Sequence, residues 1–134
     1  MYLLDTNILS ELVKKNPNRN LIDRLEPVPS AFLYTASICV MELRYGALRM
    51  GNRLDLWTKI QERIISKVRI LDFAYEEALK AAEILFELRS AGRPIGIEDI
   101  MIGSIALSNG LVVVSANTKH FSRIAKLAVE NWLL

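Results

Sequence analysis

The stretch Tyr2-Leu3-Leu4-Asp5-Thr6-Asn7-Ile8-Leu9 carries the pattern that decides the fold. Its short apolar run stops at an acidic residue, as a buried strand does where it reaches the edge of a sheet. Thr6 then opens a segment with apolar residues at helical spacing, which ends near Asn16-Pro17. A buried strand that passes directly into a helix is typical of the first unit of a parallel α/β fold.

The same alternation of apolar strands and helices runs along the rest of the chain. Further helices are predicted over residues 21–25, 40–50, 54–65, 75–91 and 97–109, and further strands over residues 32–39, 68–73, 111–115 and 126–132. Strands that are apolar throughout favour a parallel sheet covered on both faces. No repeat or linker interrupts the pattern, so we expect one domain over residues 1–134. The fold class is α/β, a three-layer α/β/α sandwich with a mostly parallel sheet of four or five strands.

Composition excludes several classes of protein. With 51% hydrophobic residues, the chain can bury a core without disulfides or a structural metal. Cys39 and His120 are its single cysteine and histidine, which excludes a disulfide framework and a conventional zinc cage. The first apolar run is too short for a secretory leader, and glycine, serine and asparagine interrupt the uncharged stretch over residues 100–118. We expect a cytoplasmic protein without a membrane span.

The net charge of +2 is too small to indicate a nucleic-acid binder by itself. Between Asp99 and Glu130, however, there is no acidic residue, while Lys119, His120, Arg123 and Lys126 all lie there. A solvated helix face and an edge that contacts phosphates both fit this distribution. These basic residues, together with Arg93, are candidates for contacts with an RNA backbone.

Three acidic residues stand where chemistry is expected in such a fold. Open parallel sheets bind ligands beyond the carboxyl ends of their strands, and Asp5 ends the first strand. Glu42 follows the second strand among apolar neighbours, where a carboxylate needs a cation, hydrogen bonds or a proton. Asp99 begins the helix over residues 97–109, and Gly103 leaves the same helical face open for a close approach. The structural alternatives are a helix cap for Asp5, pairing with Arg44 for Glu42, and a helix-dipole complement for Asp99.

An amide stands at the same predicted rim. Asn117 follows the fourth strand, where it is either a turn residue or a donor of its side-chain oxygen to an ion or bound water. Ser115 ends the same strand, and its hydroxyl could contact an ion or bound water in the same way. Carboxylates that converge there repel one another unless a cation neutralises them, and hard oxygen ligands favour Mg²⁺ or Mn²⁺. Such an ion activates water and neutralises charge on a phosphodiester.

Four sequence blocks together resemble PIN-domain nucleases and, within them, VapC-type toxins of bacterial or archaeal toxin–antitoxin pairs. The blocks are Leu3-Leu4-Asp5-Thr6-Asn7, Ser37-x4-Glu42-Leu43-x2-Gly46, Gly96-x2-Asp99 and Val114-Ser115-x-Asn117-x3-Phe121. They stand in the family's order and span essentially the whole chain. The resemblance implies a PIN-like fold and a Mg²⁺- or Mn²⁺-dependent endoribonuclease that cleaves tRNA or rRNA and so inhibits translation.

The resemblance also implies roles for individual residues. Asp5, Glu42 and Asp99 match the family's acidic metal-binding positions, and Asn117 occupies a fourth catalytic position where many members carry Asp. Thr6 matches a hydroxyl residue that supports the first Asp. The family further implies a homodimer and a cognate VapB-type antitoxin whose tail, with a basic side chain, covers the acidic pocket.

His120 stands where similar sequences often have Asp or Glu. A surface histidine and a phosphate contact or proton donor are both open at this position, and we do not assign His120 as catalytic.

Other classes of protein fit parts of the pattern. A phosphoacceptor receiver domain would use Asp72 at the end of the third strand, but it needs an acidic pair after the first strand, where Thr6-Asn7 stands. A DxD-type phosphatase fails at Asn7 for the same reason. A catalytically inactive PIN-like scaffold that binds RNA or protein remains the alternative, because Asn117 replaces an acid.

Overall fold

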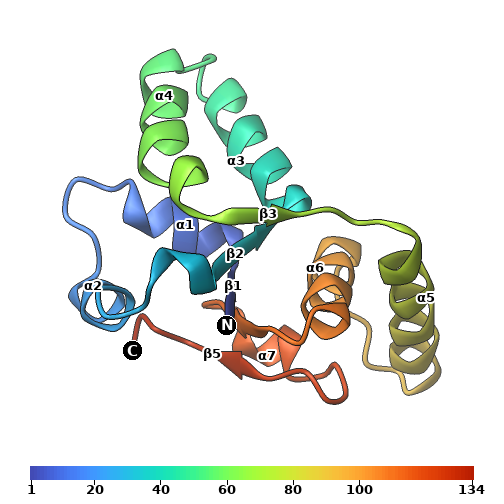
Figure 1. Ribbon diagram of the computed structural model, residues 1–134. Coiled ribbons are helices and arrows are strands. Elements are labelled where there is room, and N and C mark those ends of the chain that lie inside the picture. Colours follow the sequence, from blue (N-terminus) through green and yellow to red (C-terminus); the bar gives the residue numbers. More distant parts are fainter.

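A parallel sheet of five strands forms the middle layer of the computed structural model (Figure 1). The strands are β1 (Tyr2–Leu4), β2 (Leu33–Ala36), β3 (Arg69–Leu71), β4 (Val112–Val114) and β5 (Val129–Glu130), in the spatial order β3-β2-β1-β4-β5. In the central strand, Leu3 is paired with Tyr34 of β2 and with Val113 of β4. Strand β1 therefore has a neighbour on both sides, and Leu3 and Leu4 are fully buried.

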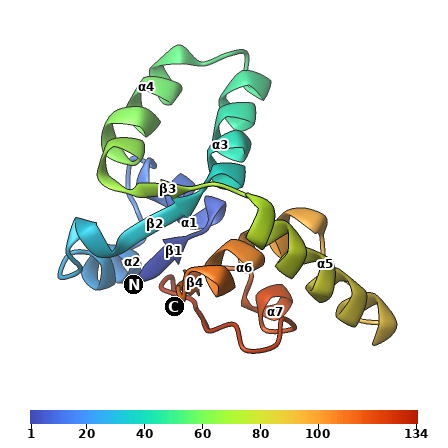
Figure 2. The ribbon, with the colours of Figure 1, turned by 45° about the vertical axis from the view of Figure 1, so that its right-hand side comes forward.

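Helices cover both faces of this sheet. They are α1 (Thr6–Leu12), α2 (Arg19–Leu25), α3 (Ser37–Arg49), α4 (Leu54–Arg63), α5 (Tyr75–Ser90), α6 (Ile97–Ser108) and α7 (Thr118–Phe121), with 3-10 turns at Ser30–Phe32 and Ile65–Lys67. Figures 1 and 2 show α3 and α4 on one side of the sheet and α5, α6 and α7 on the other. The chain moves outward from β1 to β3 and then returns past β1 to β4, so right-handed connections place the two halves on opposite faces. The predicted three-layer α/β/α architecture is confirmed.

The core is one continuous cluster of 26 buried apolar residues drawn from the sheet and both helix layers. The end of the chain contributes two of its largest side chains, Phe121 and Trp132, which are 0% and 1% exposed. The Trp132 ring packs edge-on against Tyr2, with 4.8 Å between the ring centres. Contacts between the two ends of the chain therefore help to hold the central strand. No helix is both long enough and apolar enough to cross a membrane.

The predicted elements differ from the structure most at residues 32–39, at the unpredicted helix α7, and at residues 126–132, where only Val129 and Glu130 form a strand. The strand predicted over residues 32–39 ends at Ala36, and Ser37, Ile38 and Cys39 form the first turn of α3. A short apolar run has no period that separates a buried strand from a buried helix, and here Ile38 and Cys39 are buried in either case. The short helix α7 was not predicted, because four residues are too few to show helical spacing.

Gly103 was expected to admit a close approach to α6, and the structure shows what approaches. A Cβ atom on Gly103 would lie 2.6 Å from Cδ1 of Ile124 and 3.5 Å from Cδ2 of Leu127. The small residue therefore makes room for apolar side chains of the segment after α7. Its role is in packing α7 against α6, and no ligand is needed to explain it.

Candidate active site

The end of β1 meets the end of β4 at the point where the strand order reverses. The backbone N–H of Asp5 donates to the carbonyl of Val114 at 3.0 Å, so the two strand ends lie side by side. The hydroxyl of Ser115, directly after β4, donates to Oδ2 of Asp5 at 2.7 Å. Both residues are buried, at 3% and 0% exposure. This junction is the usual ligand-binding position of an open parallel sheet.

The Asp5 carboxylate is held by neutral donors. Its Oδ1 accepts from the backbone N–H of Thr6 at 2.8 Å, which caps helix α1, and its Oδ2 accepts from Nδ2 of Asn7 at 3.1 Å as well as from Ser115. Burial raises the pKa of Asp5 above its ordinary value, against the lowering effect of these hydrogen bonds, and the negative charge of Asp99 raises it further. The helix-cap alternative is thus correct for one oxygen only, and no Lys or Arg neutralises the group.

Glu42 lies in the second turn of α3 and is joined to the first strand end by Thr6. The Thr6 hydroxyl donates to Oε1 of Glu42 at 2.8 Å. Thr6 therefore supports Asp5 through its backbone and Glu42 through its side chain, whereas the resemblance had implied support of the first Asp alone. Burial raises the pKa of Glu42, and the charges of Asp5, Asp99 and Glu98 add to that rise.

The pairing of Glu42 with Arg44 does not occur. Nη1 of Arg44 donates to Oδ1 of Asn52 at 3.4 Å, and its guanidinium lies 5.3 Å from the centre of the Trp57 ring. Residues two apart on a helix point in different directions, as expected. Glu42 thus remains a half-buried carboxylate without a basic partner.

Asp99 lies in the first turn of α6 and is connected to the segment after β4. Nδ2 of Asn117 donates to Oδ2 of Asp99 at 2.9 Å, and Nδ1 of His120 lies 3.3 Å from the same oxygen. The position suits the helix dipole, yet these side-chain contacts show that Asp99 also belongs to the acidic rim. The predicted residues Asp5, Glu42, Asp99 and Asn117 are therefore brought to one region of the molecule.

The charge at this rim is not balanced by the protein. Asp5 and Glu42 form no ion pair, and the imidazole of His120 is the sole basic group in contact with Asp99. No three His, Cys, Asp or Glu side chains lie close enough together to hold a metal ion between them. The donor set nevertheless consists of carboxylate, hydroxyl and amide oxygens around excess negative charge, and this combination fits Mg²⁺ or Mn²⁺ better than a softer metal.

Three further residues take part in the site without having been singled out. Glu98 lies in the first turn of α6, and its charge raises the pKa of Glu42. Asn7 donates to Asp5 and accepts from the backbone N–H of Ala116 at 3.0 Å, so it ties the two strand ends together. Cys39 lies with Sγ 3.9 Å from Asp5, and burial raises its pKa to about 12, so it stays a thiol. The Asp-Thr-Asn block was the available signal for Asn7.

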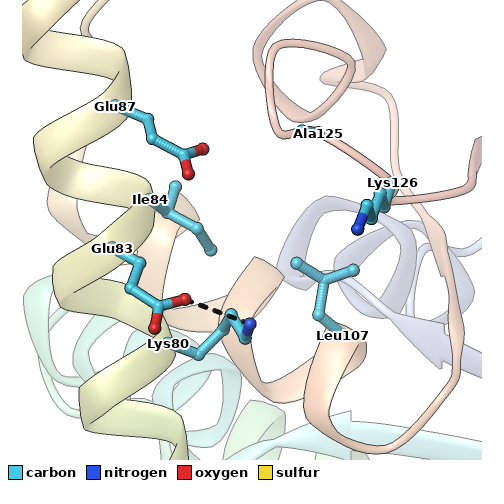
Figure 3. A pocket seen from close by; sticks show the side chains of 7 residues that line it. All are labelled: Lys80, Glu83, Ile84, Glu87, Leu107, Ala125 and Lys126. Atoms are coloured by element: carbon cyan, nitrogen blue, oxygen red, sulfur yellow. Dashed lines mark hydrogen bonds and ion pairs between the residues drawn. The ribbon is translucent and has the colours of Figure 1, made fainter.

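Two of the basic residues that were candidates for contacts with RNA make other contacts in the structure. Nη1 of Arg123 donates to the carbonyl of Pro94 at 2.9 Å. Lys126 lines a separate pocket of about 390 Å³, together with Lys80, Glu83 and Glu87, and none of the site acids lines it (Figure 3). The structure therefore places Lys126 away from the site acids and Arg123 beside the segment that precedes α6.

A groove of about 630 Å³ reaches the site at Thr6 and Glu42. We call it the α1–α3–α4 groove; Thr6 and Glu42 line it, together with apolar side chains that include Val13, Met50 and Leu56. Tyr45 also lines it and is 62% exposed. Lys14, Arg49 and Arg53 line the groove as well, so it offers a partner apolar contacts and basic groups, with Glu42 as its single acidic group.

Comparison with known proteins identifies the family. The PIN domain model matches residues 2–127. A ribonuclease VapC2 of Haemophilus influenzae is 34% identical over 132 residues, 98% of each chain. The tRNA(fMet)-specific endonuclease VapC of Shigella flexneri is 32% identical over 131 residues, 98% of this chain and 97% of the relative. The chain therefore belongs to the PIN-domain family.

Solved structures give the same result at the level of the fold. The VapBC2 complex of Rickettsia felis, bound to a promoter DNA fragment, matches with a TM-score of 0.89 and 30% identity over 98% of each chain. DNA-bound VapBC of Salmonella typhimurium matches with a TM-score of 0.83 and 34% identity over 98% of this chain and 97% of the other. Within the family, the relatives are VapC ribonucleases of VapBC toxin–antitoxin systems. The predicted resemblance is confirmed, and the receiver and phosphatase alternatives are wrong.

Proposed function

We propose that this chain is a divalent-metal-dependent endoribonuclease that serves as the toxin of a VapBC-type pair and inhibits translation by cleaving tRNA or rRNA. The observation that carries the proposal is the convergence of Asp5, Glu42 and Asp99 at the strand-order reversal without a Lys or Arg partner. The Shigella flexneri relative is named as a tRNA(fMet)-specific endonuclease, which supports tRNA as one substrate.

In the proposed site, Asp5, Glu42 and Asp99 hold Mg²⁺ or Mn²⁺, and Asn117 adds an amide oxygen. The bound ion would supply a water of lowered pKa and neutralise charge on the scissile phosphate. The protein's own contribution is positioning: Ser115 and Asn7 hold Asp5, the Thr6 hydroxyl holds Glu42, and Asn117 holds Asp99. Carboxylates held in this way do not have to reorganise when the cation or the substrate arrives.

A VapB-type antitoxin is the partner that we propose for the α1–α3–α4 groove. The solved neighbours are VapBC complexes, and the groove joins apolar lining to Glu42. An antitoxin tail would lay apolar side chains along the groove and place a basic side chain beside the acids. That charge would substitute for the cation, and the tail would exclude RNA.

We also propose a homodimer that works in the cytoplasm, where its RNA substrates are. Helix α5 presents Tyr75, Leu79 and Phe86 on one face, and these side chains are 73%, 48% and 73% exposed. Large apolar side chains that share an exposed helix face favour contact with another protein surface, here a second copy. Sedimentation equilibrium of the wild type and Phe86→Glu tests this, since a monomeric wild type would contradict it.

The central experiment is cleavage of total cellular RNA by the purified, antitoxin-free protein. Parallel reactions contain Mg²⁺, Mn²⁺ or EDTA, each beside the Asp5→Asn variant. Discrete cuts that need the metal and are absent from the variant support the proposal, and mapping them names the target. If a folded wild-type preparation cuts nothing with either metal, the chain is instead the inactive RNA- or protein-binding scaffold.

A further inference from the structure

Three side chains at the α6–α7 edge of the site form a closed triangle of contacts. Nδ2 of Asn117 lies 2.9 Å from Oδ2 of Asp99 and 2.9 Å from Nδ1 of His120. The third side, between Nδ1 of His120 and Oδ2 of Asp99, is longer, at 3.3 Å. Asp99 is 21% and His120 42% exposed, so the triangle lies at the mouth of the site. Nothing in the proposed chemistry yet uses His120.

Asp99 sets the orientation of the Asn117 amide. An ionised carboxylate accepts hydrogen bonds and cannot donate them, so the Asn117 atom that faces Oδ2 must be the nitrogen. That nitrogen is a donor only, and it also faces the imidazole at 2.9 Å. Nδ1 of His120 must therefore accept at this contact, and an accepting ring nitrogen carries no proton.

The location of the ring proton follows from the two shorter sides of the triangle. A proton on Nδ1 would turn the 3.3 Å contact with Asp99 into a hydrogen bond, but it would set two donors 2.9 Å apart on the Asn117 side. A proton on Nε2 makes both 2.9 Å contacts favourable, and the two acceptors that then face each other, Nδ1 and Oδ2 of Asp99, are the more distant pair, at 3.3 Å. The neutral imidazole in the triangle is therefore the Nε2–H tautomer.

The same hydrogen bonds determine what the Asn117 oxygen does. Both hydrogens of Nδ2 are used, one by Asp99 and one by His120, and Oδ1 accepts no hydrogen bond within the protein. The backbone N–H of Asn117 donates to Oγ of Ser115 at 2.9 Å, and that hydroxyl in turn donates to Asp5. The side-chain amide is therefore held by Asp99 and His120, the backbone of the same residue is held by Ser115, and Oδ1 is left unused.

We propose that His120 is a positioning residue that acts through Asn117. By accepting from Nδ2, its imidazole holds the amide in the orientation that keeps Oδ1 available as a further oxygen for the divalent ion or its bound water. Without this acceptor the amide rotates more freely, and its oxygen is presented to the cation for a smaller part of the time. This role rests on the proposed metal-dependent function, and it assigns a task to the histidine without making it an acid or a base.

The tautomer is tested first, on the metal-free protein. His120 is the only histidine in the chain, so an untagged sample labelled with nitrogen-15 histidine gives one set of ring signals. At about pH 8.5, well above the ordinary histidine pKa of about 6.5, we expect the proton on Nε2 in the wild type. In Asn117→Ala only Asp99 remains beside Nδ1, so the proton shifts toward Nδ1. A proton on Nδ1 in the wild type, or the same tautomer in both proteins, overturns the proposal.

Metal affinity is tested next, with variants that separate the two ring nitrogens. His120→Asn presents an oxygen near the place of Nδ1 and keeps the acceptor, whereas His120→Ala removes it. Loss of one hydrogen bond predicts a Kd for Mn²⁺ that rises about threefold to tenfold in His120→Ala and stays within about twofold of the wild type in His120→Asn. Titration calorimetry measures these values, and thermal melts check that the variants are folded. Equal affinity in the wild type and His120→Ala, or equal weakening in both variants, overturns the proposal.

These readouts separate the role of His120 from the proposed nuclease. If the wild type cuts no RNA, the nuclease proposal fails, while the ring signals still decide the geometry around Asn117. If the wild type cuts RNA and binds Mn²⁺, but His120→Ala behaves as the wild type does, the role of His120 alone is refuted.

Discussion

Two regions of this chain gather carboxylates, and they differ in how the negative charge is met. At the acidic rim beyond β1 and β4, Asp5 and Glu42 contact neutral donors. Burial raises the pKa of both, and the charge of Asp5 adds to the rise at Glu42. In the pocket between α5 and the segment after α7, Lys80 pairs with Glu83 at 3.1 Å, and Lys126 lies on the wall opposite α5 (Figure 3). The acidic rim has excess negative charge, whereas two lysines and two glutamates line the pocket, which is balanced.

The difference shows that charge imbalance identifies the site better than the presence of a hollow. Exposed ion pairs such as Lys80–Glu83 contribute little to stability and can form on any helix face. Partly buried acids without partners cost stability, and a fold keeps them where they bind something positive. The balanced pocket therefore needs no ligand, whereas the acidic rim does.

The largest expected effect on cleavage comes from removing one carboxylate at the acidic rim, with the same change in the balanced pocket as its control. Glu42→Gln removes charge at the rim but little volume, and we expect cleavage to fall by about 100-fold or more because a metal ligand is lost. Glu87→Gln makes the same change in the balanced pocket and should leave cleavage within about twofold. Initial rates on one RNA substrate measure both. Comparable losses of cleavage rate in the two variants would mean that the acidic rim and the balanced pocket do not differ in their importance for cleavage.

A smaller effect is expected from the hydroxyl that holds Glu42. Thr6→Val keeps the shape of the side chain but removes the donor to Oε1, and we expect kcat/KM to fall about tenfold. Thr6→Ser keeps the donor and serves as the matched control, with a loss of at most about twofold to threefold. If valine and serine behave alike, the hydrogen bond to Glu42 has no part in catalysis.

The excess charge also predicts how stability depends on pH. The pKa values of Asp5 and Glu42 are raised above 3.8 and 4.5, so the folded state binds their protons more tightly than the unfolded state does. Their stabilising contribution is full below about pH 4 and is lost as the pH rises through the folded pKa values. In EDTA, the Tm of Asp5→Asn relative to the wild type should therefore rise by a few degrees between pH 5 and pH 7.

Scanning calorimetry at the two pH values checks this prediction, and adding Mn²⁺ extends it. The cation should raise the Tm of the wild type more at pH 7 than at pH 5, because ionised acids bind it better. A Tm difference between variant and wild type that shrinks as the pH rises would show that Asp5 is not a destabilising charge in the metal-free protein.

The smallest effect is expected in the balanced pocket. Lys80→Ala removes the ion pair with Glu83, whose side chains are 43% and 64% exposed, so the free energy of unfolding should change by less than about 0.5 kcal/mol. Urea denaturation measures it. A loss above about 2 kcal/mol would show that this pocket is as strongly coupled to the fold as the acidic rim.

Much of the fold could be predicted because its elements have local signatures. The short apolar run before Asp5 predicted β1, and the helical spacing after residue 75 predicted α5 to within one residue at its end. Prediction failed at Ser37–Cys39 because an apolar run without a period fits a strand or a helix equally. Which of the two forms there depends on how β2 packs between β1 and β3, and no local pattern reports that.

The sequence by itself determined the α/β alternation, the places of Asp5 and Glu42 after strands and that of Asp99 at a helix start, because strand and helix periodicity are properties of neighbouring residues. Only the tertiary structure decided which groups those acids meet. The bond from Thr6 to Glu42 spans 36 positions, and that from Ser115 to Asp5 spans 110. The orientation of Asn117 between Asp99 and His120 likewise depends on the docking of α7 against α6. The packed backbone sets the distances between side chains that are far apart in the sequence. The hydrogen-bond network of the site can therefore be described only from the folded chain.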